Sequence, residues 1–275
     1  MTNEEKLSLK WNSLTIKDNF IFGKTMETNP DWCRRLIEQI LHIKIKSILY
    51  PEREKTIEAR LDSKGIRLDV YIQDNNNRSF DIEIQLTDND DLAKRMRYYI
   101  GLIDLDKLHK GKSVKYKSLG ESYIIFICTF DVFGYGYQLY DFDIICKRNQ
   151  NIKLNDHTHR IFLCTEGNDD EINSEIKNFL DYVAGRGINS EFIQQLDDTV
   201  QRVKSSKEWR LDFMTYELAL MEREELGEER GREITLLENL RSIMESFNVS
   251  AEKAMEALKI PKDKQPYYSG KLKEQ

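Results

Sequence analysis

Six polar residues at alternate positions are the part of this sequence best suited to chemistry. They are Arg67, Asp69 and Tyr71, followed by Asp81, Glu83 and Gln85. Apolar residues fill the positions between them, and this period of two is typical of β-strands that bury one face. Residues 74–78 between the two runs are rich in Asp and Asn, which favour tight turns. The sequence therefore predicts a β-hairpin with one polar face.

The centre of the turn decides which polar residues face each other. A hairpin centred on Asn76 places Asp69 opposite Glu83, and Tyr71 opposite Asp81. Opposed residues have Cβ atoms about 4.5–5.5 Å apart, and like charges there destabilise the sheet. A hard cation such as Mg²⁺, held by one or two carboxylates, would turn this repulsion into a binding site. The alternative is a solvent-exposed sheet face, where polar residues are ordinary and a shifted register separates the two acids.

The hairpin is part of a longer set of motifs that resembles the PD-(D/E)XK nuclease superfamily. Asp69 is followed by Glu83-Ile84-Gln85 and then by Arg-Met-Arg-Tyr-Tyr at 95–99, and Asp-Asn-Phe-Ile-Phe at 18–22 matches the usual opening. More narrowly, the chain resembles the group of recombination-promoting nucleases (Rpn) and PD-(D/E)XK family transposases, in which glutamine replaces the motif lysine. The similarity extends from about Asp18 to Leu163.

This resemblance implies a role for each motif residue. Asp69 and Glu83 would be the ligands of Mg²⁺, for which Mn²⁺ can substitute, with the main-chain carbonyl of Ile84 nearby. Gln85 would be catalytic in place of lysine, and a neutral amide orients water by hydrogen bonds without supplying charge. Strong metal dependence is therefore expected. Many members of the superfamily add an acid from the first helix, and the sequence does not choose between Glu38 and Asp18.

DNA contacts are expected from basic and aromatic residues near the hairpin. The net charge of −6 is unusual for a DNA-binding protein, but the position of Lys and Arg matters more than the total. The expected DNA-binding residues are Arg67, Arg95, Tyr98, Lys107, Lys110 and Lys112. The basic stretch continues to Lys117. Its alternative explanation is a helix end followed by a solvated loop, because lysines are common near helix C-termini.

Composition narrows the class of protein. The chain has 275 residues, of which 40% are hydrophobic and 33% charged, and its apolar runs are too short to span a membrane. With a polar start that lacks a secretory signal, it is expected to be soluble and cytoplasmic. The widely spaced cysteines at 33, 128, 146 and 164 are expected to be buried thiols rather than zinc ligands. His157 and His159 are expected to form a loop-edge pair rather than a metal or general-base site.

The remaining apolar pattern predicts an α/β fold. Helices are expected over 30–43 and 90–108, and strands over 44–50, 123–130, 138–147 and 160–165. The order helix, three strands, helix, strand is the core arrangement of the superfamily. The expected fold is a restriction-endonuclease-like core, with a mixed β-sheet flanked by helices and the acidic hairpin near one edge, plus a C-terminal helical region.

Three regions are expected along the chain. Residues 1–166 form the nuclease-like domain, and 167–207 form a helical extension packed on it, with helices over 170–182 and 189–203. Residues 208–275 form a charged linker helix and a small helical unit. Gly227 and Gly231 weaken the linker helix, which is expected to be mobile or conditionally helical. The unit folds back, forms a homo-oligomer or binds a protein partner, and residues 262–275 are expected to be frayed.

Two functions of different classes fit these observations. The first is a metal-dependent DNA endonuclease of the recombination-promoting or transposase-associated type, which hydrolyses phosphodiester bonds. The alternative is a catalytically inactive DNA-binding or regulatory protein that keeps the nuclease fold.

Overall fold

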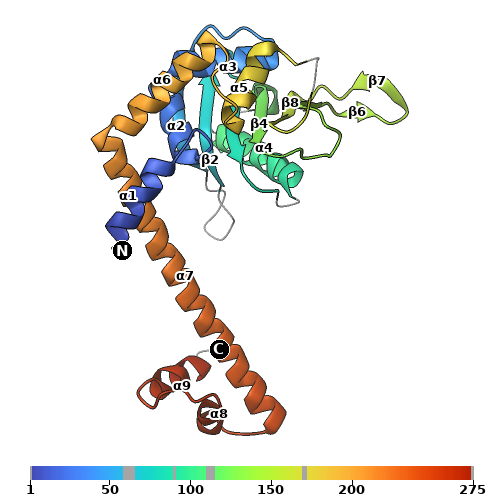
Figure 1. Ribbon diagram of the computed structural model, residues 1–275. Coiled ribbons are helices and arrows are strands. Elements are labelled where there is room, and N and C mark those ends of the chain that lie inside the picture. The colour runs from blue at the N-terminus through green and yellow to red at the C-terminus, as the bar shows by residue number, and fades with distance from the viewer. Residues whose placement is uncertain (1, 58–65, 89–90, 110–114, 169–171, 274–275) are drawn as a thin grey trace. The chain divides into compact units, whose positions relative to one another are not determined.

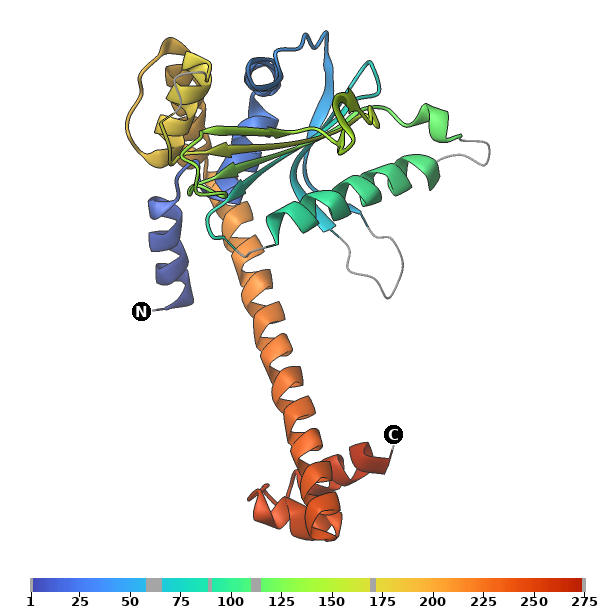
Figure 2. The ribbon, with the colours of Figure 1, turned by 90° about the vertical axis from the view of Figure 1, so that its right-hand side faces the viewer.

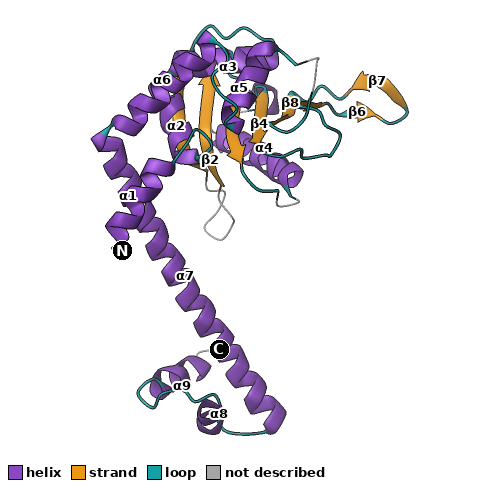
Figure 3. Cartoon of the chain, in the orientation of Figure 1, coloured by secondary structure: helices purple, strands orange, loops and turns teal. Residues whose placement is uncertain are grey.

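The computed structural model describes residues 2–57, 66–88, 91–109, 115–168 and 172–273 (Figure 1). Its helices are α1 (Asn3–Ser13), α2 (Asn19–Thr28), α3 (Pro30–Leu41), α4 (Leu92–His109), α5 (Ser174–Ala184), α6 (Glu191–Ser205), α7 (Lys207–Phe247), α8 (Ala251–Ala257) and α9 (Gln265–Lys273). Its strands are β1 (Ile48–Ile57), β2 (Ile66–Asp74), β3 (Ser79–Gln85), β4 (Ser122–Cys128), β5 (Leu139–Phe142), β6 (Ile145–Cys146), β7 (Asn149–Lys153) and β8 (Thr158–Cys164). Figure 3 distinguishes the two kinds of element.

The main sheet is mixed and has the order β1-β2-β3-β4-β8-β5. Strands β3, β4 and β8 run parallel, whereas β1, β2 and β5 join them as antiparallel neighbours. The α/β prediction is therefore confirmed, and the β2–β3 hairpin lies next to β1 near one edge of the sheet. Strand β1 begins later than the predicted 44–50 and extends to Ile57.

The turn of the hairpin is held by one aspartate. Asp74 accepts hydrogen bonds through Oδ1 from the main-chain N–H groups of Asn76 and Arg78, both at 2.9 Å. Asn77 has φ +62°, a left-handed conformation that asparagine tolerates better than most residues. The resulting register pairs Tyr71 with Asp81, as the turn centre at Asn76 predicted.

Helix α4 covers one face of the sheet. Its residues Met96, Tyr99, Ile100 and Ile103 belong to a buried cluster with Ile124, Phe126 and Cys128 of β4 and Phe162 of β8. Figure 2 shows α4 on one side of the strands and α3 on the other. On that second side Trp32 stacks on Phe192 with ring centroids 4.7 Å apart, and its indole N–H donates to the Phe192 carbonyl at 3.0 Å. This contact joins α3 to α6.

Two short elements differ from the sequence prediction. The segment expected as one strand over 138–147 contains β5 and then β6, which pairs with β7 in a separate two-stranded hairpin. Cys146 lies on this hairpin and is exposed, so its predicted burial is wrong. The strand is exposed because β6 and β7 are not part of the main sheet and have no covered face.

The chain divides into two compact units, Met1–Arg210 and Leu211–Gln275, while the three regions predicted from sequence stay a prediction. The core of the second unit contains Leu240, Ala254, Met255 and Ile260. The predicted linker segment is part of one continuous helix, α7. The prediction of a frayed end is wrong over most of its length, because α9 contributes Tyr268 and Leu272 to this core. Among the residues described, no helix is both long and apolar enough to cross a bilayer.

Candidate active site

The acidic face of the hairpin lies under α4. The parallel register pairs Asp81 with Ile124 and Glu83 with Phe126, so the acids share the face that α4 covers. Asp69 is two residues from Tyr71, which opposes Asp81, and therefore lies on this face too. The exposed fractions are 6% for Asp69, 0% for Asp81 and 2% for Glu83. The alternative of a solvent-exposed sheet face is therefore wrong.

The three carboxylates influence one another. Burial raises the pKa of Asp81 well above its ordinary value, and the negative charges of Glu83 and Asp69 raise it further. Neither side-chain oxygen of Asp81 has a hydrogen-bond partner in the part of the chain that the structure describes. A third acid thus lies close to the predicted pair, at a position for which the sequence predicted no role. The signal that could have identified it was its alternation with Glu83 and Gln85.

Arg95 of α4 bridges the two residues of the predicted E-X-Q motif. Its Nη2 lies 3.3 Å from Oε2 of Glu83, and its Nη1 donates to Oε1 of Gln85 at 2.8 Å. The amide Nε2 of Gln85 also donates to Oε2 of Glu83 at 3.0 Å. The structure therefore brings Glu83, Gln85 and Arg95 into one hydrogen-bonded group.

Tyr99 completes this group. Nη2 of Arg95 donates to the Tyr99 hydroxyl oxygen at 3.0 Å. Although burial lowers the pKa of Arg95, the hydrogen bond to Tyr99 and the charge of Glu83 raise it overall. Burial and the charge of Glu83 raise the pKa of Tyr99 to about 12, so Tyr99 remains a neutral phenol at physiological pH. The group thus carries one fixed positive charge beside buried acids.

The donor set suits a hard divalent cation. Mg²⁺ is commonly bound by one or two carboxylates, with water and substrate oxygens completing its shell. Asp69 and Glu83 supply such carboxylates, and the unsatisfied oxygens of Asp81 show that this face has spare acceptor capacity. Within the described ranges, no three His, Cys, Asp or Glu residues form a ready metal cage. The residues therefore fit a site in which two carboxylates bind the ion and water or substrate fills its other positions. They do not fit a site built from protein ligands alone.

The two candidates for a further acid are engaged elsewhere. Glu38 accepts a hydrogen bond from the Ile45 main-chain N–H at 2.8 Å and forms an ion pair with Arg34 at 2.9 Å. Asp18 accepts from the Thr15 N–H at 2.7 Å, just before α2. Both carboxylates stabilise local backbone, which leaves Asp81 as the acid that the structure places with the predicted pair.

Of the predicted DNA-binding residues, the three whose side chains the structure describes are spread along α4. Lys107 is twelve residues beyond Arg95 on α4, roughly 18 Å along the helix axis. Its Nζ contacts the Asn77 carbonyl at 3.5 Å, and burial lowers its pKa. Tyr98 is 39% exposed on the same helix. Lys110 and Lys112 lie outside the described residues, as does the side chain of Arg67, whose main chain pairs with Thr56.

Among the side chains that the structure describes, the thiols and histidines form no arrangement of their own for catalysis. Cys33, Cys128 and Cys164 are free and buried, as predicted, and burial raises the pKa of Cys33 to about 12. His159 stacks on Tyr123 with ring centroids 4.1 Å apart. Nδ1 of His157 lies 3.9 Å from the Glu121 carboxylate. These contacts are those of packing and surface residues.

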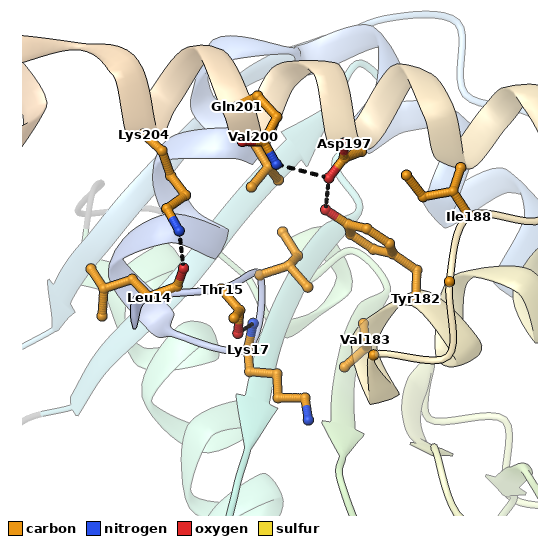
Figure 4. Close-up of a pocket in the computed structure, with 13 residues that line it drawn as sticks. Leu14, Thr15, Lys17, Tyr182, Val183, Ile188, Asp197, Val200, Gln201 and Lys204 are labelled. Carbon is orange, nitrogen blue, oxygen red and sulfur yellow. Dashed lines mark hydrogen bonds between the residues drawn. The ribbon is translucent and has the colours of Figure 1, made fainter. Parts of the chain in front are cut away.

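A separate pocket of about 460 Å³ lies between the α1–α2 loop, α5 and α6 (Figure 4). The Tyr182 hydroxyl donates to Asp197 at 2.7 Å, and Gln201 donates to the same carboxylate oxygen at 3.2 Å. Lys204 donates to the main-chain oxygen of Leu14 at 2.6 Å. Because these polar groups bind one another or the backbone, they stabilise the helix packing, and the acidic face remains the candidate active site.

A mixed sheet with an acidic hairpin followed by a covering helix defines a restriction-endonuclease-like fold, the class of the PD-(D/E)XK nucleases. Comparison with protein families gives a match over residues 19–212 to the family described as PD-(D/E)XK nuclease family transposase. The chain belongs to this family, whose nucleases generally use divalent metal ions. Comparisons with curated proteins and with solved structures gave no significant match.

Proposed function

We propose that this protein is a metal-dependent DNA endonuclease of the recombination-promoting, transposase-associated type. The main support is the position of Asp69, Glu83 and Gln85 on one buried face beside Arg95, in a chain of the PD-(D/E)XK transposase family. Asp69 and Glu83 hold the cation, which is Mg²⁺ or its substitute Mn²⁺. When bound, such an ion polarises phosphate oxygens and lowers the pKa of water.

Gln85 is suited to orient the attacking water. A glutamine amide has two N–H groups and two acceptor lone pairs. One N–H binds Glu83 and one lone pair binds Arg95, which fixes the plane of the amide. One donor and one acceptor remain for a water molecule. In the proposed reaction this water attacks phosphorus in line, and the bond to the leaving oxygen breaks.

The positive charge that the motif lysine would supply comes from another residue in this proposal. Gln85 is neutral, whereas the guanidinium of Arg95 is within 2.8 Å of the Gln85 side-chain oxygen. Arg95 can bind a phosphate through two parallel N–H groups, a geometry that a lysine ammonium lacks. Arg95 is therefore the proposed phosphate ligand nearest the motif.

One observation favours the second candidate, an inactive nuclease-fold protein that binds DNA or regulates a partner. Glu83 is almost fully buried and already forms an ion pair with Arg95. A site whose acid is neutralised by a basic side chain can be stable with no metal. DNA binding without turnover would then be the function.

Plasmid cleavage separates the two functions. We expect the parent protein to nick or linearise DNA only with Mg²⁺ or Mn²⁺, and Asp69→Asn and Glu83→Gln to lower the rate by about 100-fold or more. The matched control is Glu191→Gln, at an exposed position on α6, which should keep the parent rate. Circular dichroism verifies that each variant is folded.

Equal cleavage by all four proteins would contradict the assignment of the two acids. DNA binding that needs no divalent cation, together with no cleavage by the parent protein, would favour the inactive alternative.

A further inference from the structure

Arg95 lies next to the E-X-Q motif, where a positive charge is needed to balance the buried carboxylates. We propose that Arg95 is a resident cation of the acidic face, which a divalent ion must displace from Glu83 and Gln85 before that ion binds. The inference rests on the proposed function, because it assumes that Glu83 is a metal ligand. It adds a residue from α4 that controls access to this ligand.

The contacts of Arg95 are those of a stand-in cation. Its two terminal nitrogens reach Oε2 of Glu83 at 3.3 Å and Oε1 of Gln85 at 2.8 Å, so one guanidinium spans both motif residues. Its positive charge also acts on Asp81, whose pKa it lowers against the effects of burial and neighbouring acids. Buried carboxylates are costly unless a positive charge balances them. Arg95 supplies such a charge without a metal.

The contact between Arg95 and Glu83 is weak enough to be exchanged for a metal ion. A well-formed charge-assisted hydrogen bond between nitrogen and oxygen is about 2.7–2.9 Å long, and the Arg95–Glu83 contact is longer and involves one oxygen. A divalent ion has twice the charge and approaches carboxylate oxygens to about 2.0–2.1 Å. Two cations at the same carboxylate repel each other. Metal and guanidinium therefore compete for Glu83.

Arg95 also has a path away from the carboxylate. Its side chain is 28% exposed, whereas that of Glu83 is 3% exposed, so the guanidinium lies on the solvent side of the acid. The rings of Tyr99 and Phe126 lie 5.6 and 5.5 Å from its guanidinium carbon and offer cation–π surfaces. A change of side-chain dihedrals releases Glu83 while α4 stays in place. The released guanidinium is then available to a phosphate.

Direct measurement of Mn²⁺ binding tests this competition without any cleavage assay. The full-length protein is titrated with Mn²⁺ in the absence of DNA, and free Mn²⁺ is followed by electron paramagnetic resonance. We expect Arg95→Gln to bind Mn²⁺ about tenfold more tightly than the parent. The matched control, Arg97→Gln, changes an exposed arginine two residues along the same helix and should leave Mn²⁺ affinity unchanged.

Two further variants separate failure of the inference from failure of the proposed function. If Glu83→Gln binds Mn²⁺ as the parent does, Glu83 is not a ligand and the proposed function loses its metal site. If Glu83→Gln loses binding but Arg95→Gln binds no more tightly than the parent, only the competition is wrong.

Arg95→Lys is a second variant for the case in which Arg95→Gln does not fold. Lysine keeps a positive charge but cannot hold Glu83 and Gln85 with one planar group. We expect an affinity for Mn²⁺ between those of the parent and Arg95→Gln. Thermal unfolding verifies that each protein is folded, and if Arg95→Gln is not, an unchanged Mn²⁺ affinity in Arg95→Lys overturns the inference.

Discussion

At the scale of single residues, Asp81 is the acid whose ionisation the fold opposes. Its pKa is raised well above the usual value by burial and by the charges of Glu83 and Asp69. The folded protein therefore holds this proton more tightly than the unfolded chain, in which the pKa of Asp is about 3.9. Stability falls as pH rises from that value through the raised pKa of Asp81, and it stays reduced above.

Asparagine does not ionise, so the Asp81→Asn variant does not lose stability in this way as pH rises. We therefore expect its free energy of unfolding, relative to that of the parent, to increase as pH rises above about 4. Denaturant unfolding of both proteins between about pH 4 and pH 8 with a chelator measures this difference. Asp198→Asn, at an exposed position on α6, is the control and should show no such trend. A difference between Asp81→Asn and the parent that is constant with pH would contradict the prediction.

At the level of single residues, the sequence predicted the hairpin but not the contacts that its polar residues make with α4. Alternation of polar and apolar residues placed Asp81 and Glu83 on one face, and the register of β3 with β4 agrees. The ion pair between Glu83 and Arg95 depends on how α4 docks on the sheet, which no local pattern encodes. The sequence left Glu38 and Asp18 open as a further acid for a related reason, since the bond of Glu38 to the Ile45 N–H depends on where the chain goes after α3.

At the scale of elements, the β2–β3 turn is packed against the chain entering β4. A Cβ atom at Gly120 would lie 1.8 Å from the main-chain oxygen of Asn77, so the turn or the loop would have to move. The Asn77 side chain also donates to the Ser118 carbonyl at 3.0 Å. Gly120 thus allows a close approach that supports the start of β3, the strand that carries the motif.

We expect Gly120→Ala to lower the free energy of unfolding by about 1–3 kcal/mol, the usual cost of overpacking. Gly101→Ala is the matched control, since a Cβ atom there has no neighbour within 4 Å. It lies on α4 and should raise stability by about 1 kcal/mol through helix propensity. Denaturant unfolding measures both, and parent-like stability of Gly120→Ala would show that the turn yields without cost.

Helix α3, which the sequence predicted, and two elements that it missed differ in the spacing of their buried residues. Helix α3 buries Trp32, Leu36 and Ile40 at helical spacing, and this pattern predicted it. In α2 the consecutive residues 20–23 are all buried, so no polar face produces a period. Strand β7 is exposed along its length, so it has no apolar face to produce a period of two. Periodicity predicts amphipathic elements, and these two elements are not amphipathic.

At the scale of the whole molecule, α7 continues from one compact unit into the other. The sequence predicted a charged helix here whose stability Gly227 and Gly231 would lower. In the structure the helix continues through both, and an ion pair of 2.6 Å joins Glu228 to Arg232 one turn apart. Residues 222–232 are exposed, so helix propensity and such pairs stabilise this part more than burial does.

Within α7, limited digestion with trypsin should therefore cut first at Arg223, Arg230 or Arg232, because a helix turn without buried contacts opens most easily. Replacing Gly227 and Gly231 together by alanine adds about 1 kcal/mol of helix stability at each site. When opening is fast relative to cleavage, a gain of this size lowers the open population and slows the cut by roughly 5- to 30-fold. Gel electrophoresis with mass analysis of the fragments follows the rate.

Gly270→Ala, on α9 with open space around its Cβ position, should leave the rate unchanged. Equal rates in the double variant and the parent would mean that local opening of α7 does not limit cleavage.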